Sequence, residues 1–325
     1  MAASYYLTLD IGGTKISAAL FTRYGEIAGD IVLTAKTETF RGEEAVYRNV
    51  RNLLNELLMR HQLETGEILG IGVGSPGPLD TKRGIILHAP LMKWRNFPVL
   101  DRLTADFNLP ARLDNDGNLG ALAEQRRGAA IDLRNILYMT VSTGCGGGIL
   151  INGEIYRGAN DGAGEVGHMS IDPEGLECPC GSRGCFELYA SGTALLNTMK
   201  ADMAAGKKSR VFTLAGNDGE KLSGYHLDEA AALGDTYALA LYRKEGYYLG
   251  VGLANLFNLF DPQAIVLGGG ITKGRRFFHQ TMMDTLKERC EQPINDDSVR
   301  YSEMNDRVVL YGAFFLIREY VEKRI

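Results

Sequence analysis

The chain has 325 residues, of which 45% are hydrophobic, and its formal net charge at pH 7 is -5. This length can bury a large core and exceeds the usual size of one compact unit, so two lobes are expected. The acidic balance argues against a nucleic-acid surface, which needs clustered excess Lys and Arg, and no apolar run approaches the roughly 18 residues of a membrane span. Five cysteines without a preceding signal sequence indicate a reducing compartment, and we expect a cytoplasmic protein.

In the first part of the chain, short apolar runs end in glycine-rich turns and alternate with segments of helical spacing. The runs 5–9 and 16–21 flank a polar tip and predict a hairpin. The segment 43–61 repeats apolar residues at the spacing of one helix face. Strands are expected at 5–9, 16–21, 26–33, 68–73 and 111–113, and helices at 43–61, 98–107 and 119–127.

The second part repeats this pattern, with strands that again lead into glycine turns. We therefore expect an α/β fold of two related lobes that face a cleft: an N-terminal lobe over 1–117 and a C-terminal lobe over 118–309. The last helix, at about 310–325, is expected to pack back on the first lobe. Strands are expected at 135–141, 149–151, 154–156 and 264–267, and helices at 187–204, 227–260, 275–289 and 310–323.

Three of the glycine turns are candidates for binding a nucleotide. Glycine lets backbone N–H groups approach a phosphate and supplies the positive φ angles of an anion nest. Nearby hydroxyls and a Lys would add donors, and an Asp would suit Mg²⁺ directly or through water. Each turn alone is more often only a tight turn, and the chain contains no G-x-x-x-x-G-K-[ST] motif. The candidate nucleotide-binding residues are Asp10, Gly12, Gly13, Thr14, Lys15, Thr143, Gly144, Gly268, Gly269 and Gly270.

A metal site is indicated by His168, Cys178, Cys180 and Cys185, which stand at the spacing H-x9-C-x-C-x4-C. Four such ligands suit a tetrahedral zinc ion with no vacant position, which is the arrangement of a structural site. Disulfides or unrelated buried thiols are the alternatives. The odd and sparse cysteine count weighs against disulfides. The sequence therefore predicts a structural Zn²⁺ that holds the loop 168–185.

The segment 113–118 joins a short strand to a helix and carries candidate catalytic side chains. Asp116 could accept a proton from a substrate hydroxyl that attacks phosphorus, and Asn115 could bond neighbouring hydroxyls. The alternative is that Asp116 or Asn118 is only a helix N-cap, a role that Asp and Asn commonly fill. Taken alone, the segment favours capping.

Five motifs in this order resemble the motif set of the ROK family (repressors, open reading frames, kinases). The resemblance extends from residue 10 to about residue 270, nearly the whole chain. The motifs are Asp10-Ile11-Gly12-Gly13-Thr14-Lys15, Asn115-Asp116-Gly117-Asn118, Thr143-Gly144-Cys145-Gly146-Gly147-Gly148, Glu165-Val166-Gly167-His168 and Cys178-Pro179-Cys180-Gly181-Ser182-Arg183-Gly184-Cys185-Phe186-Glu187.

The resemblance implies an actin-like ATPase fold of doubled ribonuclease-H-like lobes and ATP-dependent phosphorylation of a sugar hydroxyl. It implies that Asp116 is the catalytic base and that the turn Ser75-Pro76-Gly77 lines the sugar pocket. It also implies a homodimer. The residues that resemble the family's sugar ligands are Asn115, Glu165, His168 and Glu187.

Three classes of function follow from the resemblance. The first is a kinase that phosphorylates the 6-hydroxyl of glucose, with N-acetylmannosamine, N-acetylglucosamine or fructose as alternative substrates. The second is a sugar-sensing transcriptional regulator, which in this family carries an added N-terminal DNA-binding helix-turn-helix, whereas here the first motif begins at Asp10. The third is a sugar-binding protein without turnover. The sequence favours the kinase because it combines Asp116 with two phosphate turns.

The chain departs from the family pattern at Cys145 and in the stretch 89–94. Cys145 stands where the family commonly has an aliphatic residue, and we expect it to be a buried, inert thiol. The stretch 89–94 lacks an Asn that often follows the Pro in this part of the sugar pocket. Trp94, the single tryptophan, is expected to be a packing anchor and not a sugar platform.

Overall fold

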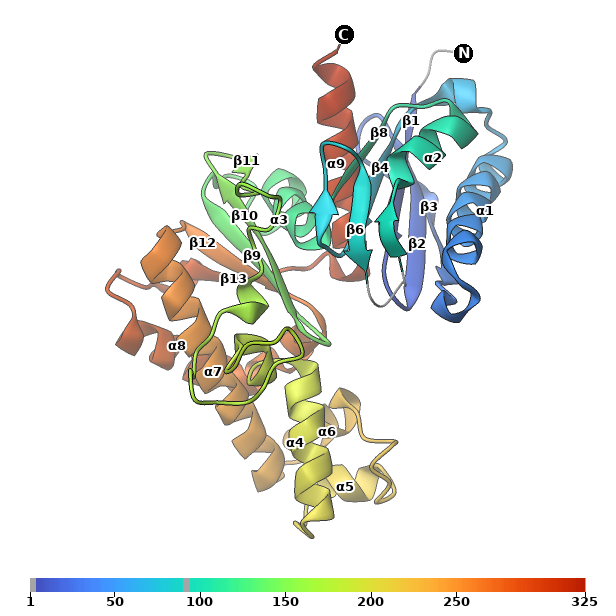
Figure 1. Cartoon of the computed structure of the whole chain (residues 1–325). Helices are drawn as coiled ribbons and strands as arrows, with labels where there is room; N and C mark the ends of the chain where they lie inside the picture. Colours follow the sequence, from blue (N-terminus) through green and yellow to red (C-terminus); the bar gives the residue numbers. More distant parts are fainter. Residues whose placement is uncertain (1–3, 90–93, 325) are drawn as a thin grey trace. The chain divides into compact units, whose positions relative to one another are not determined.

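A computed structural model describes residues 4–89 and 94–324; the departure expected at Pro90 to Lys93 lies outside the described residues. The chain divides into two compact units (Figure 1). Unit 1 comprises residues 1–138, 148–164 and 303–325, and unit 2 comprises 139–147 and 165–302. This division differs from the expected boundary at 117/118, because the helix that follows residue 115 packs against the C-terminal helix of unit 1.

Unit 1 is built on a five-stranded sheet in the order β3-β2-β1-β4-β8. The first hairpin is antiparallel, as expected, whereas β4 and β8 run parallel to β1. The carboxyl ends of β1, β4 and β8 therefore lie at one edge of the sheet. The strands are β1 (Tyr5–Ile11), β2 (Lys15–Thr22), β3 (Ile27–Lys36), β4 (Ile68–Ser75) and β8 (Ala111–Asn115).

Helices cover both faces of this sheet. On one face, α1 (Glu43–His61) and α2 (Val99–Phe107) pack in a large apolar cluster with the strands. On the other face, α9 (Val308–Glu322) buries Phe314 and Ile317 against β1 and β2 (Figure 1). Gly72 in β4 permits this contact, since a Cβ there would lie 2.1 Å from the Ala313 carbonyl oxygen.

A small antiparallel sheet in unit 1 was not predicted from the sequence. Its strands are β5 (Leu79–Asp80), β6 (Ile85–Ala89) and β7 (Trp94–Phe97). Trp94 is fully buried and stacks on Phe97 with ring centroids 4.2 Å apart. Its expected role as a packing anchor is confirmed.

The second sheet has the order β11-β10-β9-β12-β13. The glycines expected in a turn after β9 lie instead inside β10, which begins at Cys145. Glycine is needed in this strand for packing, since a Cβ on Gly148 would lie 2.1 Å from the Gly117 carbonyl oxygen. The strands are β9 (Ile136–Val141), β10 (Cys145–Ile151), β11 (Glu154–Ile155), β12 (Ala264–Gly268) and β13 (Val299–Tyr301).

Two helices expected in unit 2 are interrupted. The segment expected as one helix over 227–260 is two, because Gly234 takes a positive φ of 77° and Asp235 caps the second helix. The helix expected at 187–204 starts at Gly192, where Ser191 provides the cap. The helices are α4 (Gly192–Ala204), α5 (Arg210–Leu214), α6 (Gly224–Ala232), α7 (Thr236–Phe260) and α8 (Arg275–Arg289) in unit 2, and α3 (Asp116–Arg127) in unit 1.

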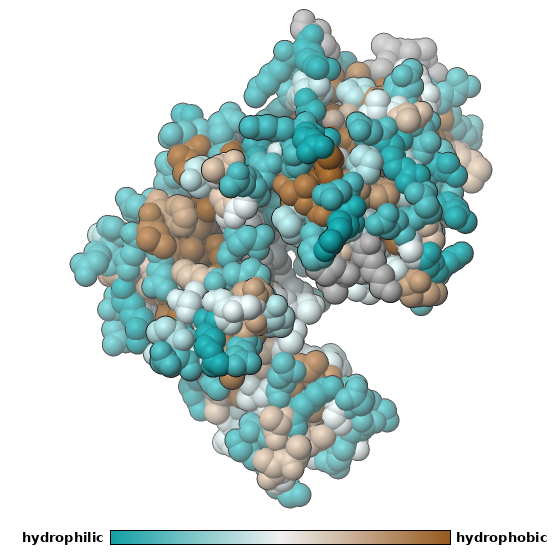
Figure 2. All heavy atoms as spheres, viewed as in Figure 1, coloured by the Kyte–Doolittle hydropathy of each residue, from teal (hydrophilic) through white to brown (hydrophobic). Residues whose placement is uncertain are grey.

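Among the helices of the described residues, none has the length and apolar character needed to cross a bilayer. On the face drawn in Figure 2, hydrophilic residues cover most of the surface, and hydrophobic residues form small separate groups. Single exposed apolar side chains such as Tyr24 and Leu259 are ordinary for a folded chain.

Candidate functional site

The turn from β8 into α3 places Asp116 at the first position of a helix. Its N-cap is Asn115, whose Oδ1 accepts hydrogen bonds from the N–H groups of Gly117 at 2.8 Å and Asn118 at 3.4 Å. The alternative that Asp116 or Asn118 is the cap is therefore wrong. Because Oδ1 of Asn115 serves the cap, the amide Nδ2 is the part of this side chain that remains for a ligand.

Asp10 lies close to Asp116 at the carboxyl edge of the first sheet. The strand register aligns Asp10 with Gly74 and Gly74 with Asp114, two residues before Asp116. Burial and then the charge of Asp116 raise the pKa of Asp10 to about 7, although Lys15 acts in the opposite direction. Two carboxyl groups that repel each other form a site that a divalent cation would stabilise, so the residues fit Mg²⁺.

The first glycine turn forms the tip of the β1–β2 hairpin. The Gly12 N–H donates to the Lys15 carbonyl oxygen at 2.9 Å, which closes the turn. Thr14 is exposed beside it. The Lys15 ammonium pairs with Asp306 at 3.0 Å, so a phosphate at this turn would compete with Asp306 for that cation.

The turn after β4 is less open than the sequence suggested. Ser75 is fully buried, and its hydroxyl donates to the Pro76 carbonyl oxygen at 3.2 Å. Gly77 follows at the surface of this turn and is half-buried. In this structure the turn therefore presents backbone, and not the Ser75 hydroxyl, to its surroundings.

A buried ion pair beneath the candidate catalytic turn was not predicted. Asp114 is fully buried, and Oδ2 of its carboxylate accepts from Nε and Nη2 of Arg157 at 2.9 and 2.5 Å. The other oxygen accepts from Asn115 N and from Asn118 Nδ2. A sequence signal existed, because an Asp in a strand that is otherwise buried needs a cationic partner. The partner, 43 residues away, could not be identified from spacing.

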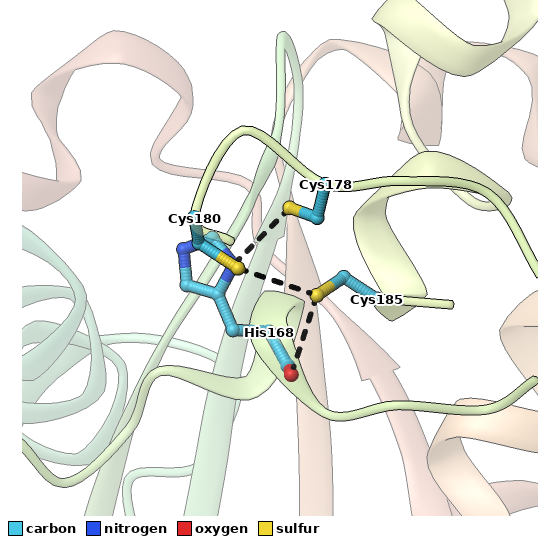
Figure 3. A group of neighbouring side chains, drawn as sticks. All are labelled: His168, Cys178, Cys180 and Cys185. Atoms are coloured by element: carbon cyan, nitrogen blue, oxygen red, sulfur yellow. Dashed lines mark hydrogen bonds between the residues drawn. The ribbon is translucent and has the colours of Figure 1, made fainter. Parts of the chain in front are cut away.

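The candidate metal ligands of unit 2 converge as the spacing predicted. One ligand atom from each of His168, Cys178, Cys180 and Cys185 lies within 4.8 Å of the others, and none of the cysteines forms a disulfide (Figure 3). The Sγ atoms of Cys180 and Cys185 are 3.6 Å apart. Two thiolates on a tetrahedral zinc ion, with bonds of about 2.3 Å, would be about 3.8 Å apart.

The electrostatics of this cluster also fit a cation. Burial and then the neighbouring thiol of Cys178 raise the pKa of Cys185 to about 12, so this thiol does not ionise readily by itself, whereas a backbone hydrogen bond from Ser182 lowers the pKa of Cys180. A bound zinc ion would stabilise the thiolates. His168 turns Nδ1 toward Cys178, at 3.9 Å from its sulfur, which leaves Nε2 for another partner.

The predicted sugar ligands of unit 2 lie around this loop. The Glu187 carboxylate is 3.6 Å from His168 Nδ1, and a Cβ on Gly144 would lie 2.6 Å from Glu187 Oε2. Glu165 precedes the short helix that carries His168 and accepts from the His168 N–H at 3.1 Å through its carbonyl oxygen. The structure thus brings Gly144 of the second glycine turn to Glu187.

Cys145, the first residue of β10, is buried beside these residues. Its thiol donates to the Ala190 carbonyl oxygen, and burial together with Glu245 raises its pKa well above the usual range. The expected burial of this thiol is confirmed, and its raised pKa agrees with an inert role.

A pocket of about 480 Å³ in unit 2 joins the second and third glycine turns. Thr143 and Gly270 line it, and Gly269, at a positive φ of 89°, lets the chain pass against Val141. Gly268 ends the strand that leads to it. Sequence reasoning missed its other walls, which come from helices whose spacing shows only an apolar face. They include Tyr225, Asp228, Tyr242, Ile271 and Lys273.

Comparison with known proteins agrees with these features. The ROK family profile matches residues 6–320. The chain is 35% identical to a glucokinase of Halalkalibacterium halodurans over 90% of this chain and 86% of that protein, and 33% identical to a xylose repressor of Bacillus spizizenii over 90% and 70%. A ROK family glucokinase from Streptomyces griseus, solved with glucose and AMPPNP, superimposes with a TM-score of 0.79 at 31% identity, covering 97% of this chain and 99% of that one. The expected two-lobed actin-like ATPase fold is confirmed, and the chain belongs to the ROK family.

Proposed function

We propose that the protein is an ATP-dependent sugar kinase that phosphorylates glucose at its 6-hydroxyl. The observation that carries the proposal is the juxtaposition of Asp10 and Asp116 at the carboxyl ends of parallel strands, next to the turn capped by Asn115. Ligands in open α/β sheets bind at such strand ends. The glucokinase relatives support the same activity.

In the proposed reaction, Asp116 accepts the proton of the sugar hydroxyl as that oxygen attacks the terminal phosphorus of ATP. Asn115 orients the sugar through Nδ2. Asp10 would hold Mg²⁺, which supplies charge neutralisation to the phosphates when bound. Backbone N–H groups at Gly13 and Thr14 stabilise the negative charge of the transferring group. Thr143 and Gly144 do the same from the second turn.

The ligands His168, Cys178, Cys180 and Cys185 would hold a structural zinc ion that takes no part in phosphoryl transfer. Held by these ligands, the loop would be rigid, and from it the side chains of Glu165, His168 and Glu187 would bind sugar hydroxyls. Because Nδ1 of His168 lies 3.9 Å from the Cys178 sulfur, ligation through this atom would set the ring orientation and tautomer and would leave Nε2 for the sugar. Rigid placement matters because an error of about 1 Å in a reacting geometry can cost roughly a hundredfold in rate.

The pocket of unit 2 would hold the nucleoside of ATP. Gly270 offers backbone without a side chain at one wall, and Tyr225 offers a ring at another. The Tyr242 hydroxyl donates to Asp228, whose carboxylate is an acceptor inside the pocket. These groups suit a flat, amphipathic base.

The test is ADP release by the purified protein with a panel of sugars: glucose, mannose, fructose, N-acetylglucosamine and N-acetylmannosamine. We expect turnover with glucose, and a fall in kcat of about a hundredfold or more for Asp116→Asn, because general base catalysis contributes on this scale. Asp132→Asn, at an exposed loop position, is the matched control and should keep full activity. An Asp116→Asn protein with undiminished kcat would refute the assigned base.

The similarity to xylose repressors supports a second candidate function, that of a sugar-sensing regulator without turnover. The same assay separates the two, because a regulator binds its sugar but releases no ADP with any member of the panel. Dimer formation, which the family resemblance implies, is part of the proposal and is measured by sedimentation of the purified protein.

A further inference from the structure

A second pocket, of about 460 Å³, lies entirely within unit 1. Its walls come from α3, α9, the edge strand β8, and β11 with the turn before it. Figure 1 labels these elements. The loop after β5 completes the rim with Lys82. None of the residues to which the proposed reaction assigns a role lines it.

Five cationic side chains face this pocket, against two carboxylates, in a chain whose net charge is negative. One of the carboxylates, Glu319, is already paired with Arg126 at 2.8 Å. The other, Glu154, is exposed at the rim. The pocket therefore carries a local positive charge that the rest of the protein does not share. The cationic residues are Lys82, Arg112, Arg126, Arg157 and Lys323.

The three arginines are held in place by other groups. The Arg112 guanidinium lies over the Tyr320 ring, 3.4 Å from its centroid. Arg126 donates through Nε to Glu319 and through Nη2 to the Gly153 carbonyl oxygen. Arg157 is fixed by Asp114 through Nε and Nη2. Fixed guanidinium groups lose less conformational entropy on binding an anion, and in Arg126 and Arg157 these contacts leave Nη1 as a donor.

Two lysines add charge that is not neutralised by a partner. Among the ion pairs of residues 4–89 and 94–324, Lys82 and Lys323 have no carboxylate partner, and both are exposed at the rim. Apolar side chains, among them Leu113, Leu122 and Leu316, supply the rest of the lining. Guanidinium donors, exposed ammonium groups and an apolar wall together match a phosphate group attached to an organic body.

We propose that this pocket is a binding site for a phosphate monoester of metabolite size, separate from the site of phosphoryl transfer. Inorganic phosphate carries the same phosphate group and is the simplest alternative ligand for the pocket. A macromolecular ligand is not favoured, because the cations converge on one cavity and do not spread over an exposed surface.

The pocket has a direct connection to the candidate catalytic turn. Arg157 lines it and also holds Asp114, whose carboxylate in turn accepts from the Asn115 N–H. A phosphate on Nη1 of Arg157 would share the guanidinium charge with Asp114 and so change the electrostatics of the turn that carries Asp116. Occupancy is therefore expected to change sugar turnover; this consequence, unlike the binding itself, rests on the proposed function.

Binding is measured by calorimetry with glucose 6-phosphate, inorganic phosphate and, as the uncharged control, further glucose. Saturating glucose and a non-hydrolysable ATP analogue are present throughout, so that the site of phosphoryl transfer is filled. We expect glucose 6-phosphate to bind, free phosphate to bind more weakly and glucose to give no heat. The double variant Lys82→Glu, Lys323→Glu alters only exposed side chains and should weaken binding about tenfold or more.

Arg48→Glu, an exposed position on α1, is the control for a general charge effect and should bind as the parent does. Asp116→Asn should also bind normally, which separates this site from the catalytic one whether or not the protein proves to be a kinase. Unchanged affinity in the double variant, or loss of binding in Asp116→Asn, would overturn the proposal. So would the absence of any heat with glucose 6-phosphate.

Discussion

The buried pair of Asp114 and Arg157 allows the sharpest test of the structure. In Arg157→Met the side-chain volume is roughly kept, but a fully buried carboxylate loses its cation. Removing one partner of a buried pair costs about 3–5 kcal/mol. Asp114 keeps its hydrogen bonds to Asn115 and Asn118, and the Arg157 side chain is 32% exposed, so we expect about 2 kcal/mol.

The assay is urea unfolding followed by tryptophan fluorescence. Trp94 is the single tryptophan and is buried in unit 1, so the signal reports the unit that contains the pair. Arg60→Met breaks an exposed pair with Glu56 and should cost less than about 0.5 kcal/mol. Adding Asp114→Asn to Arg157→Met should recover part of the loss. If Arg157→Met is as stable as Arg60→Met, the buried pair does not exist in solution.

Three further predictions follow. Cys180→Ser should reduce bound zinc from one ion per chain to a small fraction in metal analysis, whereas Cys145→Ser should leave it unchanged; equal zinc in both contradicts the ligand set. Gly72→Ala should destabilise unit 1 by at least about 2 kcal/mol in the same urea assay, because the new Cβ meets the backbone of α9; parental stability would mean that α9 packs elsewhere. In the metal-free protein, Asp116→Asn should lower the pKa of Asp10 from about 7 toward its usual value in a carboxyl NMR titration, since a negative neighbour is removed; an unchanged pKa contradicts their proximity.

The elements that were predicted correctly are those whose own residues decide their structure. Helices α1 and α8 begin and end where the apolar spacing placed them, because local periodicity and the flanking glycines suffice. The split at Gly234 was missed because apolar spacing continues on both sides of it. The start of β10 was mistaken for a turn because its glycines, such as Gly148, are typical of turns. Glycine is needed at this position because the strand packs closely against α3, and this contact cannot be recognised from the local sequence.

The candidate site divides in the same way. The zinc ligands are close in sequence, so type and spacing alone predicted their convergence. The cap at Asn115 was misassigned because three consecutive polar residues are equally good cap formers, and only the backbone φ and ψ of the helix start distinguish them. Arg157 and the walls of the pocket in unit 2 were not found, since they reach their positions through tertiary packing.

The arrangement around Asp116 explains why a base can be held at the start of a helix without becoming its cap. A carboxylate at the N-cap would be bound by backbone N–H groups and would have its proton affinity lowered. Asn115 takes that position with a neutral amide and accepts the cap bonds from Gly117 and Asn118, while the Asp116 carboxylate, one residue further on, shares the Gly117 N–H at 2.8 Å. Asp114 below it is neutralised by Arg157 and therefore adds little repulsion. Three adjacent polar residues thus have three different tasks. The substitution Asn115→Asp would keep the cap but place a second negative charge beside the proposed base.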